Sequence, residues 1–300
     1  VNGLGWGGKA YIYVRSNGNW SPTPVAVLTE AVPAQNDFFA TSVALSADGK
    51  TALVGSDDYS SADPIGRAYV FSGNGSAWHT MPDAVLTDPG ATPGNMFGST
   101  VALSGDGNTA LVGAGNGSDG KQAYIFQRTG SSWSSVAAFD EPTAQTGSGF
   151  VNTVKLSADG HTAVVGLLTG TGIAQVFQRA ADGSWSHPTT QLMNDPADAN
   201  GDAYGWSAAV SADGNVRVIG SPYAVSHASP AGSLFSSMPG PGMTYAYSVQ
   251  EQATTNNNSS SSTSNPQATS STAARGGCAD GLFGLLMLSM LLTLKTASRR

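Results

Sequence analysis

The stretch FGSTVALSGDGNTALVGAG, residues 97–115, recurs in altered form three more times in this 300-residue chain. The near-copies begin at Phe39, Phe150 and Tyr204, and in each one a Ser-x-Asp-Gly sequence separates two apolar runs. Asp-Gly between such runs is a strong signal for a β-hairpin, because glycine accepts the positive φ that the turn requires. The four turns return roughly every 55 residues, a period that predicts a stacked or radial repeat architecture.

Each repeat contains four short strand-like runs. In the first complete repeat they occupy residues 42–46, 51–56, 68–71 and 84–87. The first run alternates apolar and polar residues, the second is nearly all apolar, and the third carries aromatic residues. A tryptophan stands between the third and fourth runs, and its large apolar surface predicts packing between neighbouring repeats. These residues are Trp20, Trp78, Trp133 and Trp185.

The composition agrees with an all-β chain. Glycine accounts for 38 residues and charged residues for only 11%, as expected for short strands and tight turns rather than helices. Four antiparallel strands per repeat predict a β-propeller of four-stranded blades, in which each blade is covered by its neighbours. The chain enters this pattern at the third run, so we expect part of a ring of six or seven blades. The predicted propeller covers residues 1–249, with blades at about 1–31, 38–91, 96–145, 150–200 and 204–249.

The repeat resembles the FG-GAP family, the propeller repeat of integrin α chains and of many bacterial surface proteins. Many members carry a calcium loop of the type D-x-D-x-D-G, whereas turns such as SADGKT in this chain hold one acid each. The resemblance therefore implies a propeller whose family metal sites are lost. The FG signature stands at Phe97-Gly98 and Tyr204-Gly205, and is degraded at Phe39-Ala40 and Phe150-Val151; the GAP signature stands at 113–115 and 220–222, and is weaker at 55–57 and 166–168.

One further loop is a candidate calcium site. Asp198, Asn200 and Asp202 stand at i, i+2 and i+4, as at the start of a calcium loop. Ala203 occupies the place of the usual loop glycine, so an ordinary polar turn is the alternative. A second cluster of acids lies within residues 57–63. No other cofactor is predicted.

No catalytic motif is evident. The four histidines fall at different positions of the repeat, and no spacing suggests a nucleophile with its base. We therefore predict that the chain is not an enzyme and has no catalytic residues. The expected function is a non-catalytic binding or adhesion scaffold, which recognises a protein or glycan through the variable loops 56–66, 114–121, 167–171 and 221–241. Two alternatives are a secreted hydrolase or lyase acting on glycans, with part of its site upstream of residue 1, and a calcium-stabilised adhesin.

The charge and the C-terminal tail suggest a cellular location. A net charge of −7 without a basic stripe argues against a nucleic-acid partner. Residues 250–277 are rich in Ser, Thr and Asn and predict a flexible linker. Residues 278–300 contain an apolar run at 281–294, predicted to form a short hydrophobic helix, followed by Lys295, Arg299 and Arg300.

This tail resembles the tripartite C-terminal sorting signals of Gram-negative surface proteins. The resemblance implies cleavage by a membrane protease, and lipidation in some cases, at Gly276, Gly277 and Cys278. The alternative is a simple C-terminal membrane anchor through residues 281–294, with the basic residues on the cytoplasmic side. Either reading predicts an exported protein at the cell surface or outer membrane.

Overall fold

The computed structural model describes residues 8–30, 37–57, 66–90, 94–115, 121–140, 150–168, 172–186, 192–194, 203–222 and 243–248. In this part of the chain every regular element is a β-strand, and there is no helix. The predicted all-β class is therefore confirmed. The predicted linker at 250–277 and the segment 278–300, including the apolar run 281–294, lie outside the described residues.

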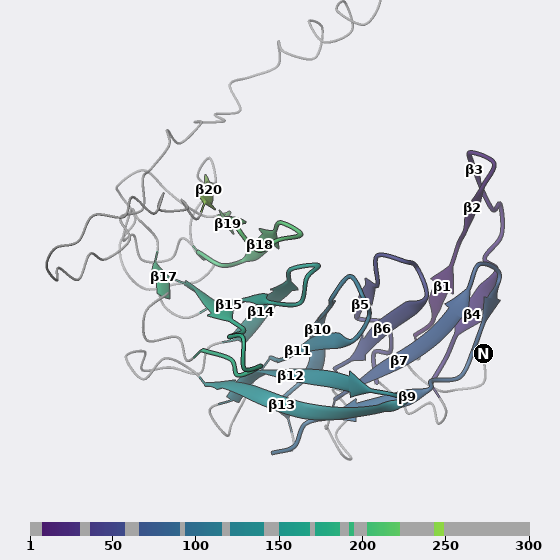
Figure 1. Cartoon of the computed structure of the whole chain (residues 1–300), viewed down its shortest axis with the longest axis horizontal. Coiled ribbons are helices and arrows are strands. Elements are labelled where there is room, and N and C mark those ends of the chain that lie inside the picture. The colour runs from purple at the N-terminus through teal and green to yellow at the C-terminus, as the bar shows by residue number, and fades with distance from the viewer. Residues whose placement is uncertain are drawn as a thin grey trace, which may run out of the picture.

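The strands form antiparallel sheets that follow one another in the order of the repeats along an arc (Figure 1). We group them into units 1 to 5; unit 1 comprises two separate two-stranded sheets, and each of the other units is a single sheet. Units 1 and 2 are the least regular, because their outer strands are short. Unit 1 contains β1 (Ala10–Ile12), β2 (Arg15–Ser16), β3 (Asn19–Trp20) and β4 (Ala26–Leu28), and unit 2 contains β5 (Ser42–Leu45), β6 (Thr51–Ser56), β7 (Arg67–Asn74), β8 (Ala77–Trp78) and β9 (Ala84–Thr87).

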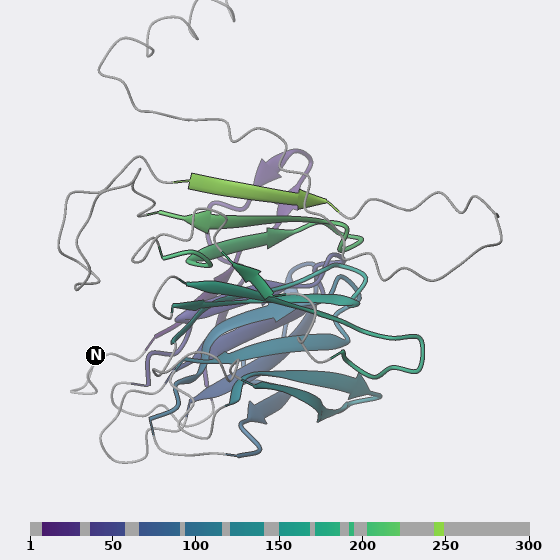
Figure 2. The same ribbon diagram turned by 90° about the vertical axis from the view of Figure 1, so that its left-hand side faces the viewer.

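The later units have simpler sheets, in which each strand pairs with the next in the chain. Viewed from the side, units 3, 4 and 5 lie face to face in succession (Figure 2). Unit 3 contains β10 (Phe97–Leu103), β11 (Thr109–Ala114), β12 (Lys121–Thr129) and β13 (Ser132–Asp140); unit 4 contains β14 (Phe150–Leu156), β15 (Thr162–Leu168), β16 (Ile173–Gln178) and β17 (Leu192–Asn194); unit 5 contains β18 (Ser207–Val210), β19 (Val216–Ser221) and β20 (Met243–Ser248).

The Ser-x-Asp-Gly sequence forms the turn between the first two strands of units 2 to 5. In unit 2, the Ser46 hydroxyl donates to Asp48 Oδ1 at 2.7 Å, and the Lys50 amide donates to the same oxygen at 3.0 Å. These hydrogen bonds favour the ionised carboxylate and lower the pKa of Asp48. Gly49 follows with a φ of 67°, which explains why the turn requires glycine.

The turns of neighbouring units are joined by backbone hydrogen bonds. The Ala47 amide donates to the Gly105 carbonyl at 2.9 Å, and the Gly105 amide donates to the Ala158 carbonyl at 2.8 Å. The Asp159 amide donates to the Ala212 carbonyl at 3.0 Å. We call this series the turn ladder, and it connects units 2 to 5 without interruption.

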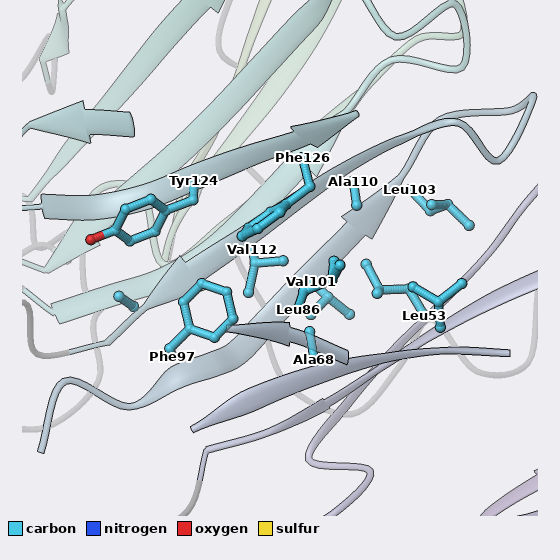
Figure 3. Packing of buried hydrophobic residues seen from close by; sticks show 12 residues of the cluster. Leu53, Ala68, Leu86, Phe97, Val101, Leu103, Ala110, Val112, Tyr124 and Phe126 are labelled. Carbon is cyan, nitrogen blue, oxygen red and sulfur yellow. The ribbon is translucent and has the colours of Figure 1, made fainter. Parts of the chain in front are cut away.

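Apolar side chains fill the seams between units. At the seam between units 2 and 3, Leu53 and Leu86 of one sheet belong to the same buried cluster as Phe97 and Phe126 of the other (Figure 3). Val101 and Leu103 lie in the same cluster, close to Leu53. Because the faces of a single sheet are apolar, each unit depends on its neighbours for burial.

The tryptophans follow the prediction at three of four positions. Trp78, Trp133 and Trp185 are partly buried, each against the cluster of a different seam. Trp20 is 67% exposed, so the prediction of packing between units is wrong for this residue. The reason is that its face of unit 1 has no neighbouring unit among the described residues.

Candidate functional site

Three polar side chains meet at the seam between units 1 and 2. Glu30 follows β4, Asp37 precedes β5, and Tyr69 lies on β7. Their exposed fractions are 6%, 2% and 5%, so all three are buried. The Ser56 hydroxyl donates to the backbone carbonyl of Asp37, which places the group at the end of β6 remote from its Ser-x-Asp-Gly turn.

The three side chains form one hydrogen-bonded group. The Tyr69 hydroxyl donates to Glu30 Oε2 at 3.0 Å, and the Glu30 carboxyl is also hydrogen-bonded to the Asp37 carboxyl. The Phe39 amide donates to Asp37 Oδ1 at 3.3 Å and fixes that side chain against the backbone. Two carboxyl groups in direct contact must share a proton, because two negative charges at this distance repel strongly.

The surroundings keep Glu30 protonated at neutral pH. Burial raises its pKa, and the hydrogen bond and charge of Asp37 raise it further. The hydrogen bond from Tyr69 and the positive charge of Arg67 act in the opposite direction, and the resulting pKa is about 8. Burial and the neighbouring Glu30 also raise the pKa of Tyr69, so its hydroxyl remains a hydrogen-bond donor.

The next seam has an amide in place of one acid. Asn95 Nδ2 donates to Asp88 Oδ2, and the Phe97 amide donates to Asn95 Oδ1 at 3.2 Å. Asp88 and Asn95 are as buried as Glu30 and Asp37. An acid and an amide hydrogen-bond without sharing a proton. Asp37 and Asn95 occupy the same position in two repeats. The aspartate at this position is therefore what allows two carboxyl groups to share a proton at the seam between units 1 and 2.

The group has diverged further at the seam between units 3 and 4. Gln175 occupies the position of Tyr69 in the repeat and is fully buried. Its Nε2 donates to the backbone carbonyl of Asp140 at 3.3 Å. A glutamine in this position cannot provide the phenolic donor that Tyr69 offers to Glu30.

A serine, a histidine and an aspartate also meet on unit 2. His79 Nδ1 lies 2.6 Å from Asp83 Oδ1, and the Ser72 hydroxyl donates to Asp83 Oδ2 at 2.5 Å. The aspartate is the central member, whereas an activated serine needs the histidine next to its hydroxyl. This exposed group therefore stabilises the β7–β9 region rather than forming a nucleophile.

The site residues predicted from the sequence are not described. Asp198, Asn200 and Asp202, the candidate calcium ligands, lie outside the described residues, as do Gly276, Gly277 and Cys278. Among the residues that are described, no three His, Cys, Asp or Glu side chains gather in a group suited to a metal ion. The same part of the chain has no helix long and apolar enough to cross a bilayer.

The Glu30–Asp37 pair was not predicted, because the two acids stand in different repeats and match no known motif. A usable signal was present in the alignment of the repeats. Glu30 and Asp88 both follow a fourth run, and Asp37 and Asn95 both stand two residues before an aromatic residue. An acid at the end of one repeat together with an acid at the start of the next indicates such a pair.

Comparisons with known proteins agree with the repeat. The FG-GAP repeat family matches residues 81–126. Among solved structures, the chain is similar to the periplasmic gluconolactonase PpgL of Pseudomonas aeruginosa, with 15% sequence identity and a TM-score of 0.49. The match covers 81% of this chain and 61% of that chain, so this chain spans less than two thirds of the length of that protein. No curated protein matches the sequence.

These findings correct one prediction. The chain was expected to be a non-catalytic scaffold and not an enzyme, but the solved structure that it resembles is that of a gluconolactonase. At 15% identity and a TM-score of 0.49 the likeness assigns no activity to this chain, so its chemistry has to follow from its own residues.

Proposed function

We propose that the protein is a β-propeller hydrolase acting on a carbohydrate, with Glu30 and Asp37 as its acid–base pair. One observation carries this proposal: Glu30 is hydrogen-bonded to Asp37 and Tyr69, and its pKa is raised to about 8. A general acid works best when its pKa lies near the pH of the reaction. Two carboxyl groups with one proton provide an acid and a base side by side.

The pair can hydrolyse a C–O bond with all protons accounted for. The Asp37 carboxylate accepts a proton from a water molecule while the water oxygen bonds to the electrophilic carbon. Glu30 donates its proton to the leaving oxygen as the C–O bond breaks. Transfer of the proton from Asp37 to Glu30 then restores the resting state. Tyr69 holds the Glu30 carboxyl in place through its 3.0 Å hydrogen bond.

The geometry favours an ester or lactone bond over a glycosidic bond. Glycosidases of the usual kind hold their two carboxyl groups about 5–10 Å apart, whereas Glu30 and Asp37 are in direct contact. A contacting pair suits water attack on a carbonyl carbon, as in other paired-carboxylate hydrolases. The net charge of −7 favours a neutral substrate over a polyanion.

Paired substitutions test the proposal on the full chain. Sugar lactones, acetylated sugars and nitrophenyl glycosides serve as probes. Asp37→Asn reproduces the pairing of Asp88 with Asn95 and should leave the fold intact, yet lower kcat/KM by about 10²–10⁴-fold. Asp88→Asn at the next seam is the control and should keep full activity. Equal activity of the Asp37→Asn variant and the unmodified chain, or no hydrolysis of any probe, would overturn the proposal.

We further propose that the units are blades of a closed propeller. The four-stranded order of units 3 and 4, each strand beside the next in the chain, supports this arrangement. Closure requires further strands beyond those described. Calcium binding at Asp198, Asn200 and Asp202 remains a prediction, and chelation followed by thermal unfolding tests it.

We also propose that the protein is exported and processed at its C-terminus. The polar linker 250–277, the apolar run 281–294 and the basic residues after it support a sorting signal. Cleavage would occur near Gly276, Gly277 and Cys278. Mass spectrometry of the mature C-terminus in the native host tests this location, and an intact Arg300 in the mature protein would contradict it.

A further inference from the structure

Arg67 stands at the start of β7, on the face of unit 2 that also carries Tyr69. Side chains alternate between the two faces of a strand. Ala68 belongs to the cluster shared with unit 3, whereas Tyr69 belongs to the cluster shared with unit 1. Arg67, two residues before Tyr69, therefore faces unit 1, the side on which Glu30 and Asp37 lie.

The register of unit 2 places Arg67 at the level of Asp37. Arg67 pairs with Ser56 of β6, and the Ser56 hydroxyl donates to the Asp37 carbonyl. The positive charge of Arg67 acts on this group, because it opposes the rise in the pKa of both Glu30 and Tyr69. Arg67 is half-buried, whereas the other three side chains of the group are buried. It is therefore the charged group of this site that a molecule arriving from solvent meets first.

The arginine accompanies the pair of acids. The equivalent residues of units 3, 4 and 5 are uncharged, and they are Gln122, Ile173 and Met243. At the seam between units 2 and 3, Asn95 replaces one of the two acids and Gln122 replaces the arginine. The cation and the second acid thus occur together at one seam and are both absent from the next. Arg67 therefore belongs to the Glu30–Asp37 site rather than to the repeat in general.

Hydrolysis of a lactone or ester creates negative charge at two stages. Addition of water to the carbonyl carbon turns the carbonyl oxygen into an oxyanion. Cleavage of the C–O bond then leaves a carboxylic acid, which releases its proton to water. The product carboxylate would lie beside the Asp37 carboxylate, and like charges at close range repel. A guanidinium offsets this repulsion, because it offers five N–H donors in a planar fork that matches a carboxylate.

We propose that Arg67 is the anion-binding residue of the Glu30–Asp37 site, and that it holds first the oxyanion and then the product carboxylate of a sugar lactone or ester. This inference rests on the proposed hydrolase function, and it assigns the side of the site on which the carbonyl oxygen lies. The leaving oxygen then lies toward Glu30, which donates its proton. The site accordingly favours bonds whose hydrolysis gives an acid. Glycosides, whose products are neutral, gain no such contact with Arg67.

Binding of a product-type anion tests the proposal without turnover. Galactonate is titrated into the full chain in a calorimeter, and galactitol, which lacks the carboxylate, is the uncharged comparison. Arg67→Met should weaken galactonate binding about 10–100-fold and leave galactitol binding unchanged. Arg67→Lys keeps the charge but loses the planar fork, so its affinity should lie between the two. Arg128→Met is the control, because Arg128 is a half-buried arginine on β12 whose Nε donates to the Gly130 carbonyl.

The pKa of Glu30 provides a second measurement. In the Arg67→Met variant it should rise above about 8, because the charge that opposes its rise is removed. Nuclear magnetic resonance of the glutamate side-chain carboxyl carbons follows this titration, and Arg67→Lys should leave it unchanged. A raised pKa with unchanged galactonate affinity would make Arg67 only the counter-ion of the acids and would overturn the proposal.

Two further outcomes separate this proposal from the hydrolase function. Hydrolysis of a lactone by a chain that does not bind galactonate, or binds it equally well as Arg67→Met, would overturn the role of Arg67 and leave the hydrolase function in place. Galactonate binding that depends on Arg67, in a chain that hydrolyses no probe, would support the anion site and contradict the hydrolase function.

Discussion

The carbonyl oxygen of Gly98 lies only 2.0 Å from the place where a Cβ on Gly55 would be. Gly55 is near the end of the second strand of unit 2, and Gly98 is near the start of the first strand of unit 3. The same relation holds between Gly166 and the Gly205 carbonyl, at 2.1 Å. At these two seams, glycines of the repeat signature are thus the points at which two backbones touch.

Substitution of Gly55 by alanine should separate units 2 and 3. A Cβ at this position overlaps backbone atoms that cannot rotate away, so we expect a loss of about 2–4 kcal/mol in the free energy of unfolding. Gly115→Ala is the control, because the nearest atom to its added Cβ is 3.2 Å away. Urea unfolding measures both variants. Equal stability of the two would contradict the role assigned to Gly55.

The stability of the protein should depend on pH through Glu30. Its carboxyl has an ordinary pKa of 4.5 when unfolded and about 8 when folded, so between these values the native state retains a proton that the unfolded chain has lost. The contribution of Glu30 to stability is complete below pH 4.5 and is lost as the pH rises through 8. The slope is at most about 1.4 kcal/mol per pH unit.

Glu30→Gln removes this titration while keeping a hydrogen-bonding side chain. The variant should therefore gain stability relative to the unmodified chain as the pH is raised from 5 to 8. Urea unfolding at several pH values gives the difference directly. A difference that stays constant over this range would show that Glu30 does not hold its proton in the native state.

Arg217 of β19 is expected to destabilise the fold. It is only 6% exposed, and its Nε and Nη2 have no hydrogen-bond partner among the described residues. Burial lowers the pKa of its guanidinium group. Units 2, 3 and 4 have Ala52, Ala110 and Ala163 at this position, and all three are buried. Replacement by methionine keeps the volume and removes the charge.

The Arg217→Met variant should therefore unfold at a higher temperature, with a gain of about 1–3 kcal/mol. Calorimetry provides the measurement. Lys155→Met, at an exposed position of β14, controls for the loss of a positive charge in general. A lower Tm for Arg217→Met would mean that the guanidinium has an acidic partner in the folded protein.

Trp133 and Trp20 stand at the same position of the repeat but should contribute differently to the free energy of unfolding. Trp133 packs against the cluster between units 2 and 3, whereas Trp20 is 67% exposed. Trp133→Ser should lower the free energy of unfolding by about 1–3 kcal/mol, and Trp20→Ser by less than about 0.5 kcal/mol. Denaturant unfolding followed by circular dichroism compares the two. Similar losses would indicate that Trp20 is buried in solution.

The sequence predicts the strands better than it predicts the chemistry. Local rules that each repeat obeys separately predict the turn at Ser46 and Asp48, the apolar second strand and the seam position of Trp133. These rules do not predict the contact between Glu30 and Asp37. That contact joins the end of one unit to the start of the next and depends on a single Asn-to-Asp difference between repeats. The exposure of Trp20, Val43 and Leu45 likewise depends on which neighbour is present, and no local pattern contains that information.

The turn ladder has a consequence for how such a chain can change during evolution. The turns of units 3 and 4 each supply one donor to the following turn and one acceptor to the preceding turn, as Gly105 does between Ala47 and Ala158. Duplication or deletion of a whole unit keeps these hydrogen bonds between successive turns. Insertion of one residue in a turn moves its donor and acceptor away from their partners in the neighbouring turns. Genes for proteins of this type are therefore expected to vary in length by whole repeats, with insertions confined to the opposite ends of the sheets.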